Sequence, residues 1–279
     1  MAVVFALAAS LAWGTSDFLA GMASRRVPVV WVLLLGELGG LAVIGLVAAI
    51  ARPAFFASAS DVLLAMGAGA SGVVALGCFY RALAIGTMSV VAPISATGAA
   101  LPVLAGIVMG DRLSAVVVIG LVVTVAGVAL ASREVHDDEE SARAGRSGIA
   151  LAAVAAVGFG GFFVLSHHPA EASVVWTLVL VRAAPLPVVA AIALRGAPLR
   201  AGRGMTLGVA AIGTIDLAAI TLVAVASTRG ELGVVAVLGS MYPVVTVLLA
   251  AAFLGERVRP PQLAGVVLAL GGVAAVAAG

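Results

Sequence analysis

The sequence has 279 residues, of which 63% are hydrophobic and 10% charged, and its mean hydropathy is +1.25. Soluble domains carry roughly 45–50% apolar and about 25% charged residues, so this composition excludes a large soluble domain and predicts a polytopic membrane protein. All fifteen basic residues are arginines scattered singly or in pairs, and the formal charge is only +2, so no nucleic-acid partner is expected.

Ten apolar segments are long enough to be membrane helices, taking about 20 residues for one crossing. They cover residues 2–21, 28–50, 61–80, 87–109, 113–131, 148–166, 173–194, 205–227, 232–254 and 261–279. Continuous runs of this length disfavour a transmembrane β-barrel, whose strands alternate over about 10 residues. The sequence therefore predicts an all-α protein with ten transmembrane helices.

One connection is both long and polar, residues 132–147, and it contains Asp137-Asp138-Glu139-Glu140. It is interpreted as a solvated linker between a first five-helix unit, 1–131, and a second, 148–279. The small-residue pairs Gly106-x3-Gly110 and Gly204-x3-Gly208 are interpreted as sites of close helix packing.

The two units share sequence features at a constant spacing. Val29-Val30-Trp31 returns 145 positions later as Val174-Val175-Trp176, and residues 86–92 are paralleled by residues 230–236 at a spacing of 144. Gly110-Asp111-Arg112-Leu113 is paralleled by Gly255-Glu256-Arg257-Val258 at 145. These matches indicate duplicated five-helix units.

Because five is odd, the second unit must enter the membrane from the side opposite to the first. The duplication is thus predicted to be an inverted-topology repeat. That architecture places a substrate site near the bilayer midplane and permits alternating access, so the pattern predicts a transporter.

Glu37 and Arg182 occupy equivalent positions, each six residues after the repeated tryptophan and about ten residues into a predicted helix. A charge at the bilayer centre costs roughly 2.5–3.5 kcal/mol on insertion scales and usually faces a partner or a wet cavity. Two interpretations are open. In one, Arg182 binds an acidic group of the substrate while Glu37 takes an amine or a proton; in the other, the two form a buried ion pair that holds the units together.

Two further acids fall inside predicted helices. Asp216 has no base near it in sequence, and burial favours the neutral form of a lone carboxylate, so it is predicted to couple transport to protons. The alternative is a neutral acid bonded to a neighbouring helix. Asp17 either faces the cavity or pairs with Arg25 or Arg26, and its helical face shared with Trp13, four residues earlier, favours the cavity.

Aromatic residues and helix-breaking prolines supply the remaining candidates. Tyr242 precedes Pro243 inside the ninth predicted helix, and Ser95 lies between Pro93 and Pro102 in the fourth, where a freed carbonyl makes either a hinge or a site. Phe162 belongs to an aromatic group in the sixth helix, where packing is the alternative. The predicted substrate-binding residues are Trp13, Asp17, Glu37, Ser95, Phe162, Arg182 and Tyr242, and the predicted proton-coupling residues are Glu37 and Asp216.

Several motifs resemble the drug/metabolite transporter superfamily of the EamA type. They are Ala12-Trp13-Gly14-Thr15-Ser16, the endings Gly110-Asp111-Arg112 and Gly255-Glu256-Arg257, and the late glycines of the short fifth and tenth helices. The resemblance covers nearly the whole chain and implies a multi-pass bacterial inner-membrane carrier for efflux of amino acids or related metabolites by secondary active transport. The chain departs from it at Glu37, where many relatives carry a basic residue, so the substrate class is not carried over.

Other functions are weighed against this one. An intramembrane enzyme would need a nucleophile with its base or a metal-binding set such as His-Glu-x-x-His, neither of which the sequence contains; a passive channel needs no paired charges. The sequence predicts no catalytic residue, cofactor or metal, a small-molecule substrate with protons as partners in the bilayer, and either a monomer or a dimer.

The orientation in the membrane is read from the arginines. With the N-terminus outside, the cytoplasmic connections hold eleven arginines and the opposite ones hold Arg52, Arg112 and Arg229, while Arg182 is intramembrane. The positive-inside rule then favours both termini outside, whereas the resemblance implies both inside.

Overall fold

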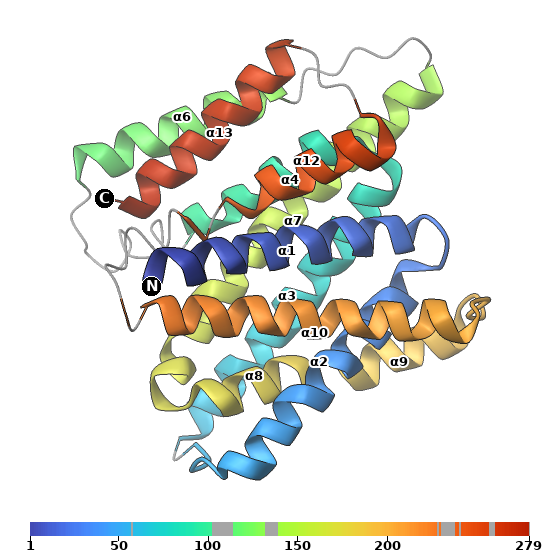
Figure 1. Ribbon diagram of the computed structural model, residues 1–279, viewed down its shortest axis with the longest axis vertical. Coiled ribbons are helices and arrows are strands. Elements are labelled where there is room, and N and C mark those ends of the chain that lie inside the picture. Colours follow the sequence, from blue (N-terminus) through green and yellow to red (C-terminus); the bar gives the residue numbers. More distant parts are fainter. Residues whose placement is uncertain are drawn as a thin grey trace.

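The computed structural model describes residues 1–56, 58–101, 114–131, 139–227, 229, 238–239, 241–256 and 260–278, and within them the regular structure is helical (Figure 1). The first predicted unit contributes α1 (Ala2–Ser24), α2 (Val29–Ala51), α3 (Ala59–Ile85), α4 (Met88–Ala96), the 3-10 helix η1 (Thr97–Ala100) and α6 (Ala115–Ala131). The second contributes α7 (Glu139–Ala172), α8 (Val174–Ala183), α9 (Leu186–Arg195), α10 (Arg203–Ser227), α12 (Tyr242–Leu254) and α13 (Pro260–Ala278).

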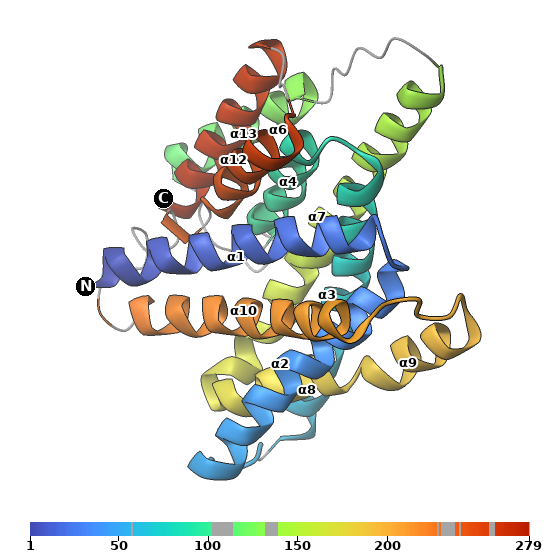
Figure 2. The same ribbon diagram turned by 45° about the vertical axis from the view of Figure 1, so that its right-hand side comes forward.

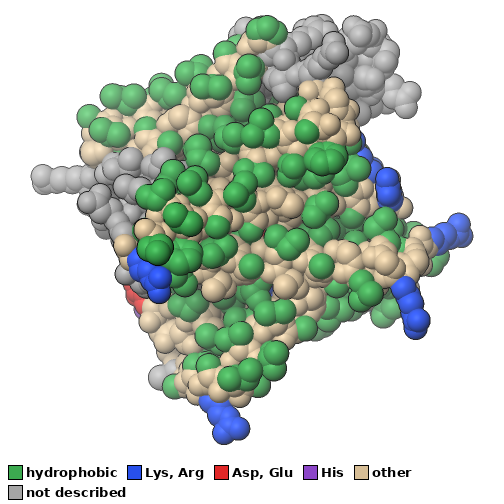
Figure 3. All heavy atoms as spheres, viewed as in Figure 1, with side chains coloured by type: hydrophobic (Ala, Val, Ile, Leu, Met, Phe, Trp, Pro, Cys, Tyr) green, Lys and Arg blue, Asp and Glu red, His purple; other side chains and the backbone are tan. Residues whose placement is uncertain are grey.

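The helices have the length and composition of membrane spans. Within the described residues, α1, α2, α3, α7, α10 and the α8–α9 pair are each long and apolar enough to cross a membrane, and shorter apolar helices lie in α6, α12 and α13. The face seen in Figure 3 is covered by hydrophobic side chains, with arginines at its borders. Such a surface suits a lipid environment, so this is a multi-pass membrane protein. The predicted count of ten spans is matched only in part, because the fourth is described only as far as residue 101.

The predicted linker is helical in its described part. Helix α7 begins at Glu139, inside the predicted linker 132–147, and residues 132–138 lie outside the described part. Good helix formers such as Glu, Ala and Arg follow Glu139, and these favour continuing the sixth helix upstream of its apolar segment.

The seventh predicted helix is broken where its prolines lie. Helix α8 ends at Ala183 and α9 starts at Leu186, because Pro185 has no N–H to donate to the carbonyl of Val181. That carbonyl oxygen lies against Gly69 of α3 so closely that a Cβ there would overlap it. The break therefore faces protein, where breaks of this kind are tolerated.

The ninth predicted helix is interrupted as well. Met241 forms a turn and α12 begins at Tyr242, so Pro243 lies in the first turn of a helix and not in a helix interior. The Ser10 hydroxyl of α1 donates hydrogen bonds to the carbonyl oxygens of Leu238 and Gly239, the second of them 2.9 Å away. Pro243 has no N–H to donate to the Gly239 carbonyl, so a side chain from the other unit satisfies it. The Leu238 carbonyl also accepts the backbone N–H of Met241.

Each predicted unit packs its first helix against helices of the other unit. Helix α1 packs against α10 and α12, and its counterpart α7 packs in the same way against α3 and α4. The fifth and tenth helices, α6 and α13, pack against each other at one edge of the molecule (Figures 1 and 2). This reciprocity is what two copies related by a two-fold axis produce.

Glycines of each unit also lie close to the backbone of the other unit, in the same reciprocal pattern. A Cβ at Gly213 would overlap the carbonyl of Gly36, just as one at Gly69 would overlap that of Val181. In the last pair of helices, Gly127 lies against Ala269, and its counterpart Gly272 lies against Thr124.

The small-residue pairs singled out in the sequence are not where these approaches occur. Gly204 and Gly208 have no heavy atom of another part of the described chain within 4 Å of a built Cβ, so the packing expected there is wrong. The pair at 106 and 110 lies outside the described residues, as do the repeat blocks 110–113, 230–236 and 257–258. Helix faces decide which glycines meet, and spacing alone does not specify a face.

Two tryptophans lock the units at their edges. The indole Nε1–H of Trp31 donates to the carbonyl of Ala197, 2.9 Å away, after α9. That of Trp176, the repeated residue, donates to the carbonyl of Pro53, 3.0 Å away, after α2. The tryptophan of the repeated Val-Val-Trp motif therefore makes the same hydrogen bond in both units, each time to a backbone carbonyl of the other unit.

Candidate functional site

A cavity of about 460 Å³ lies between the two units, and every predicted site residue lines it. Trp13 and Asp17 come from α1, Glu37 from α2, Arg182 from α8 and Asp216 from α10. Ser95 comes from α4, Phe162 from α7 and Tyr242 from α12. The volume is in the range of small-molecule sites, roughly 300–1,000 Å³.

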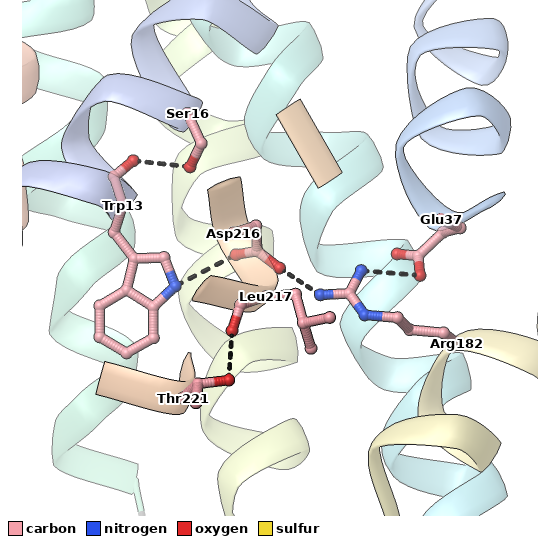
Figure 4. Close-up of polar contacts among 7 residues, drawn as sticks. All are labelled: Trp13, Ser16, Glu37, Arg182, Asp216, Leu217 and Thr221. Carbon is pink, nitrogen blue, oxygen red and sulfur yellow. Dashed lines mark hydrogen bonds and ion pairs between the residues drawn. The ribbon is translucent and has the colours of Figure 1, made fainter. Parts of the chain in front are cut away.

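Four helices are joined by one chain of polar contacts around Arg182 (Figure 4). Its Nη1 donates to Glu37 Oε2 at 3.3 Å, and its Nη2 donates to Asp216 Oδ2 at 2.5 Å. The other Asp216 oxygen accepts the indole N–H of Trp13 at 3.1 Å. The buried ion pair between equivalent positions is therefore present, and both of its members also line the cavity.

Asp216 is not the lone carboxylate that the sequence suggested. Its partner, Arg182, is 34 residues earlier and reaches it from another helix, a proximity that sequence spacing cannot reveal. The alternative, a neutral acid bonded to a neighbouring helix, agrees with the contact to another helix, but the partner is a guanidinium and the contact is an ion pair.

The guanidinium of Arg182 is enclosed by its partners. The residue is 5% exposed, and Gly40, one turn after Glu37, gives it room, because a Cβ there would come within 2.6 Å of Nη1. Its Nε is buried and has no hydrogen-bond partner among the described residues. Two carboxylates occupy the two ends of the fork, so this cation is compensated within the protein.

Asp17 is placed differently from the other acids. It is 8% exposed and lines the cavity, and no hydrogen bond or ion pair to it exists within the described ranges. Arg25, one of the two arginines predicted as possible partners of Asp17, instead has its Nη2 3.7 Å from Glu256 Oε1 and donates to the carbonyl of Leu83. One helical turn away on the same face, the ring of Trp13 meets that of Tyr242 edge-on, with centroids 6.0 Å apart.

The other predicted residues contribute mainly shape. The hydroxyl of Ser95 donates to the carbonyl of Ala152 in α7 at 3.4 Å. Phe162 packs edge-on against Phe163 and lies close to Gly72 of α3. They continue the cavity wall without adding charge.

One end of the cavity is closed. The lining runs from the charged cluster toward the end of α7 and the start of α8, at Ser166, Ala170 and Val174. Toward the junction of α3 and α4, the fully buried Leu83 and Met88 fill the interior.

The closed end is tied by a carboxylate. Glu256 accepts the backbone N–H groups of Met88 and Ser89 at 3.1 and 3.0 Å, and the Ser89 hydroxyl at 2.9 Å. A carboxylate at a helix N-terminus satisfies free N–H donors and the helix dipole. This contact fastens the end of α12 to the start of α4.

Sequence reasoning missed the apolar wall and one glycine. Val73, Leu76 and Phe79 of α3 line the cavity together with Phe159 of α7, but ordinary apolar residues in a membrane helix carry no signal of their own. Gly40 could have been found from its position three residues after Glu37 on one helical face.

Comparison with known proteins gives a family and a fold. The EamA-like transporter family matches twice, at residues 1–133 and 146–278. A crystal structure of a protein with 22% sequence identity covers 99% of this chain and 97% of its own, with a TM-score of 0.64, which shows a shared fold. No curated protein matches the sequence.

Proposed function

The chain belongs to the EamA-like transporter family, and we propose that it is a carrier that moves a small metabolite by alternating access in exchange for protons. The metabolite is an amino acid or a related compound, the direction is export, and the membrane is the bacterial inner membrane. The observation that carries this proposal is the cluster of opposite charges in a cavity between two duplicated units.

Reciprocal packing supports alternating access. Each unit supplies a first helix, α1 or α7, that packs on the third helix of the other unit. Since the units are arranged alike, exchanging their conformations would close the open end of the cavity and open the closed one. The bond between Glu256 and the start of α4 is then one that must break when the closed end opens.

The charge balance supports proton coupling. Three carboxyl groups, those of Asp17, Glu37 and Asp216, line the cavity with a single guanidinium, so if all three are ionised two negative charges are uncompensated. An uncompensated charge in a buried site is costly, so these acids must hold protons or face a cation. An acid that Arg182 leaves during the transport cycle would take up a proton or a substrate group for the same reason.

The test is exchange in proteoliposomes. Purified protein is reconstituted, and radiolabelled amino acids, organic amines and organic acids are offered singly to vesicles that are empty or preloaded with the same unlabelled solute. A carrier gives faster uptake into preloaded vesicles for at least one solute. A channel gives no such stimulation, and that result for the whole panel would overturn the proposal.

Proton coupling is tested with Glu37→Gln and Asp216→Asn under an imposed pH gradient. Both variants should express normally and lose pH-driven uptake by about 10-fold or more, equivalent to about 1.4 kcal/mol. The matched control is Asp61→Asn, because Asp61 is a buried acid outside the cavity, 2.7 Å from His168. Undiminished pH-driven uptake in both cavity variants would remove these acids from the mechanism.

A further inference from the structure

We propose that this cavity selects an organic cation, a protonated amine with an apolar or aromatic body, which Asp17 binds, and that it discriminates against the same molecule carrying an additional carboxylate. The proposal rests on the carrier function proposed above and narrows its substrate class, from amino acids and related compounds to the amines among those related compounds.

The only guanidinium in the described lining is already occupied. Nη1 and Nη2 of Arg182 face Glu37 and Asp216, at 3.3 and 2.5 Å. A substrate carboxylate would have to displace one of these acids and leave it without its partner in a largely buried site, which is unfavourable. Arg182 therefore serves as an internal counter-ion and does not present a free anion site.

Asp17 offers the opposite chemistry. It is more than nine-tenths buried, lines the cavity and lacks a hydrogen bond or ion pair in the described part of the chain. Its carboxyl group shares the cavity with that of Asp216, and two carboxylates in one site repel each other unless a cation or a proton compensates them. An ammonium group is the ligand that removes both difficulties at once.

All ionisable groups in the described lining of the cavity are compatible with a bound cation. They are Asp17 of α1, Glu37 of α2, Arg182 of α8, Asp216 of α10 and Tyr242 of α12. Three are acids, one is a phenol, and the single base is paired with two of the acids. Trp13 and Tyr242 add aromatic rings on the Asp17 side, and ring faces attract cations by about 0.5–2 kcal/mol.

The rest of the cavity fits an apolar body. Helices α3 and α7 contribute Val73, Leu76, Phe79, Phe159 and Phe162 to its lining, and no charged side chain from these two helices is present in it. The lining thus places carboxylates at one side and an aromatic surface at the other. An amphipathic amine matches both, whereas a zwitterionic amino acid would bring its carboxylate next to Asp17.

The experiment compares matched solute pairs in the same proteoliposomes. The pairs are phenethylamine with phenylalanine, tryptamine with tryptophan, and isoamylamine with leucine; each differs by one carboxylate. Amine-stimulated exchange should exceed that of the amino acid by about 10-fold in at least one pair, equivalent to about 1.4 kcal/mol. Equal or faster exchange of the amino acid in every pair that is transported, or transport of anions alone, would overturn the proposal.

The role of Asp17 is tested by Asp17→Asn, with Asp17→Glu to retain the charge and Asp61→Asn as the control. Amine exchange should fall about 10-fold or more in Asp17→Asn, recover in part in Asp17→Glu and persist in the control. Ligand-induced thermal stabilisation of the unmodified protein in detergent gives a second reading that needs no variant to fold: phenethylamine should raise the melting temperature and phenylalanine should not. Full amine exchange by Asp17→Asn would remove this residue from the site.

The two proposals fail in different ways. Exchange of amino acids or organic acids without amines leaves the carrier intact and removes the cation preference. The absence of stimulated exchange for every solute in the panel removes the carrier itself.

Discussion

Helices α1 and α10 form one wall of the cavity, and their duplicated counterparts α7 and α3 form the other. The first wall carries Trp13, Asp17 and Asp216, while the second carries glycines and aromatic residues such as Phe79 and Phe162. Phe162 occupies the position 145 residues after Asp17, so equivalent places in the two units hold a carboxylate and a phenyl ring. The backbone arrangement is repeated and the chemistry is not.

This difference distinguishes the helix arrangement, which the two duplicated units share, from the cavity side chains, in which they differ. Equivalent glycines and tryptophans keep the helices at equivalent distances, so the frame is common to both units. A few differences at the cavity then place Asp17 and Asp216 on the wall formed by α1 and α10. Between the walls, Glu37 of α2 and Arg182 of α8 are equivalent positions with opposite charges, and they pair with each other.

The charged cluster around Arg182 predicts the largest effect. Arg182→Met leaves the buried Glu37 and the partly buried Asp216 without a cation, and breaking a buried ion pair from one side costs about 3–5 kcal/mol. We expect a large loss of thermal stability in detergent, measured by unfolding-coupled fluorescence. The triple variant with Arg182→Met, Glu37→Gln and Asp216→Asn should regain most of the stability, because it buries no charge, but should not regain transport. Normal stability of Arg182→Met alone would contradict the ion-pair account.

The close helix packing common to both units predicts a smaller loss of stability, of similar size on the two walls. Gly213→Ala and Gly69→Ala each place a Cβ on a carbonyl of the other unit, and overpacking costs typically about 1–3 kcal/mol. Thermal unfolding should show similar losses for both variants.

The controls for these glycines lie in the same helices. Gly208 of α10 faces open space and Gly67 of α3 has its nearest neighbour at 3.6 Å, so alanine should be tolerated at both. A loss at Gly213 without one at Gly69 would show that the walls are not packed equivalently.

The apolar wall should affect affinity more than rate. Phe162→Ala removes part of the surface that meets the body of the substrate, and a lost aromatic contact of about 1.4 kcal/mol weakens binding about 10-fold. Concentration-dependent amine exchange should show a raised KM with a nearly unchanged maximal rate. Phe253→Ala is the control, because that ring is 73% exposed on the outer surface; a fall in maximal rate alone would argue against a binding role for Phe162.

The smallest effects are expected at the edges. Trp31→Phe and Trp176→Phe each remove one indole hydrogen bond to the other unit, worth about 0.5–1.5 kcal/mol. Both variants should unfold at slightly lower temperature and transport normally. Unequal losses of thermal stability would show that the two units differ at these edge contacts as well as in the cavity.

Part of the site was predictable because the sequence contains repeated motifs at a constant spacing. The spacing of 145 between the Val-Val-Trp motifs aligned Glu37 with Arg182. A pair between them was one of the two interpretations that this alignment left open, and the structure contains it. The cost of burying charge then identified the same residues as functional candidates. Apolar segment lengths likewise indicated an all-helical membrane protein.

The tertiary structure alone decided which partner each polar group has. Asp216 pairs with Arg182, Asp17 has no partner in the described chain, and Ser10 bonds the carbonyls before Pro243. The physical reason is that membrane helices are apolar on nearly every face, so periodicity does not reveal which face turns inward. Sequence therefore determined which residues are costly in a bilayer, and the packing of the two units determined how they are compensated.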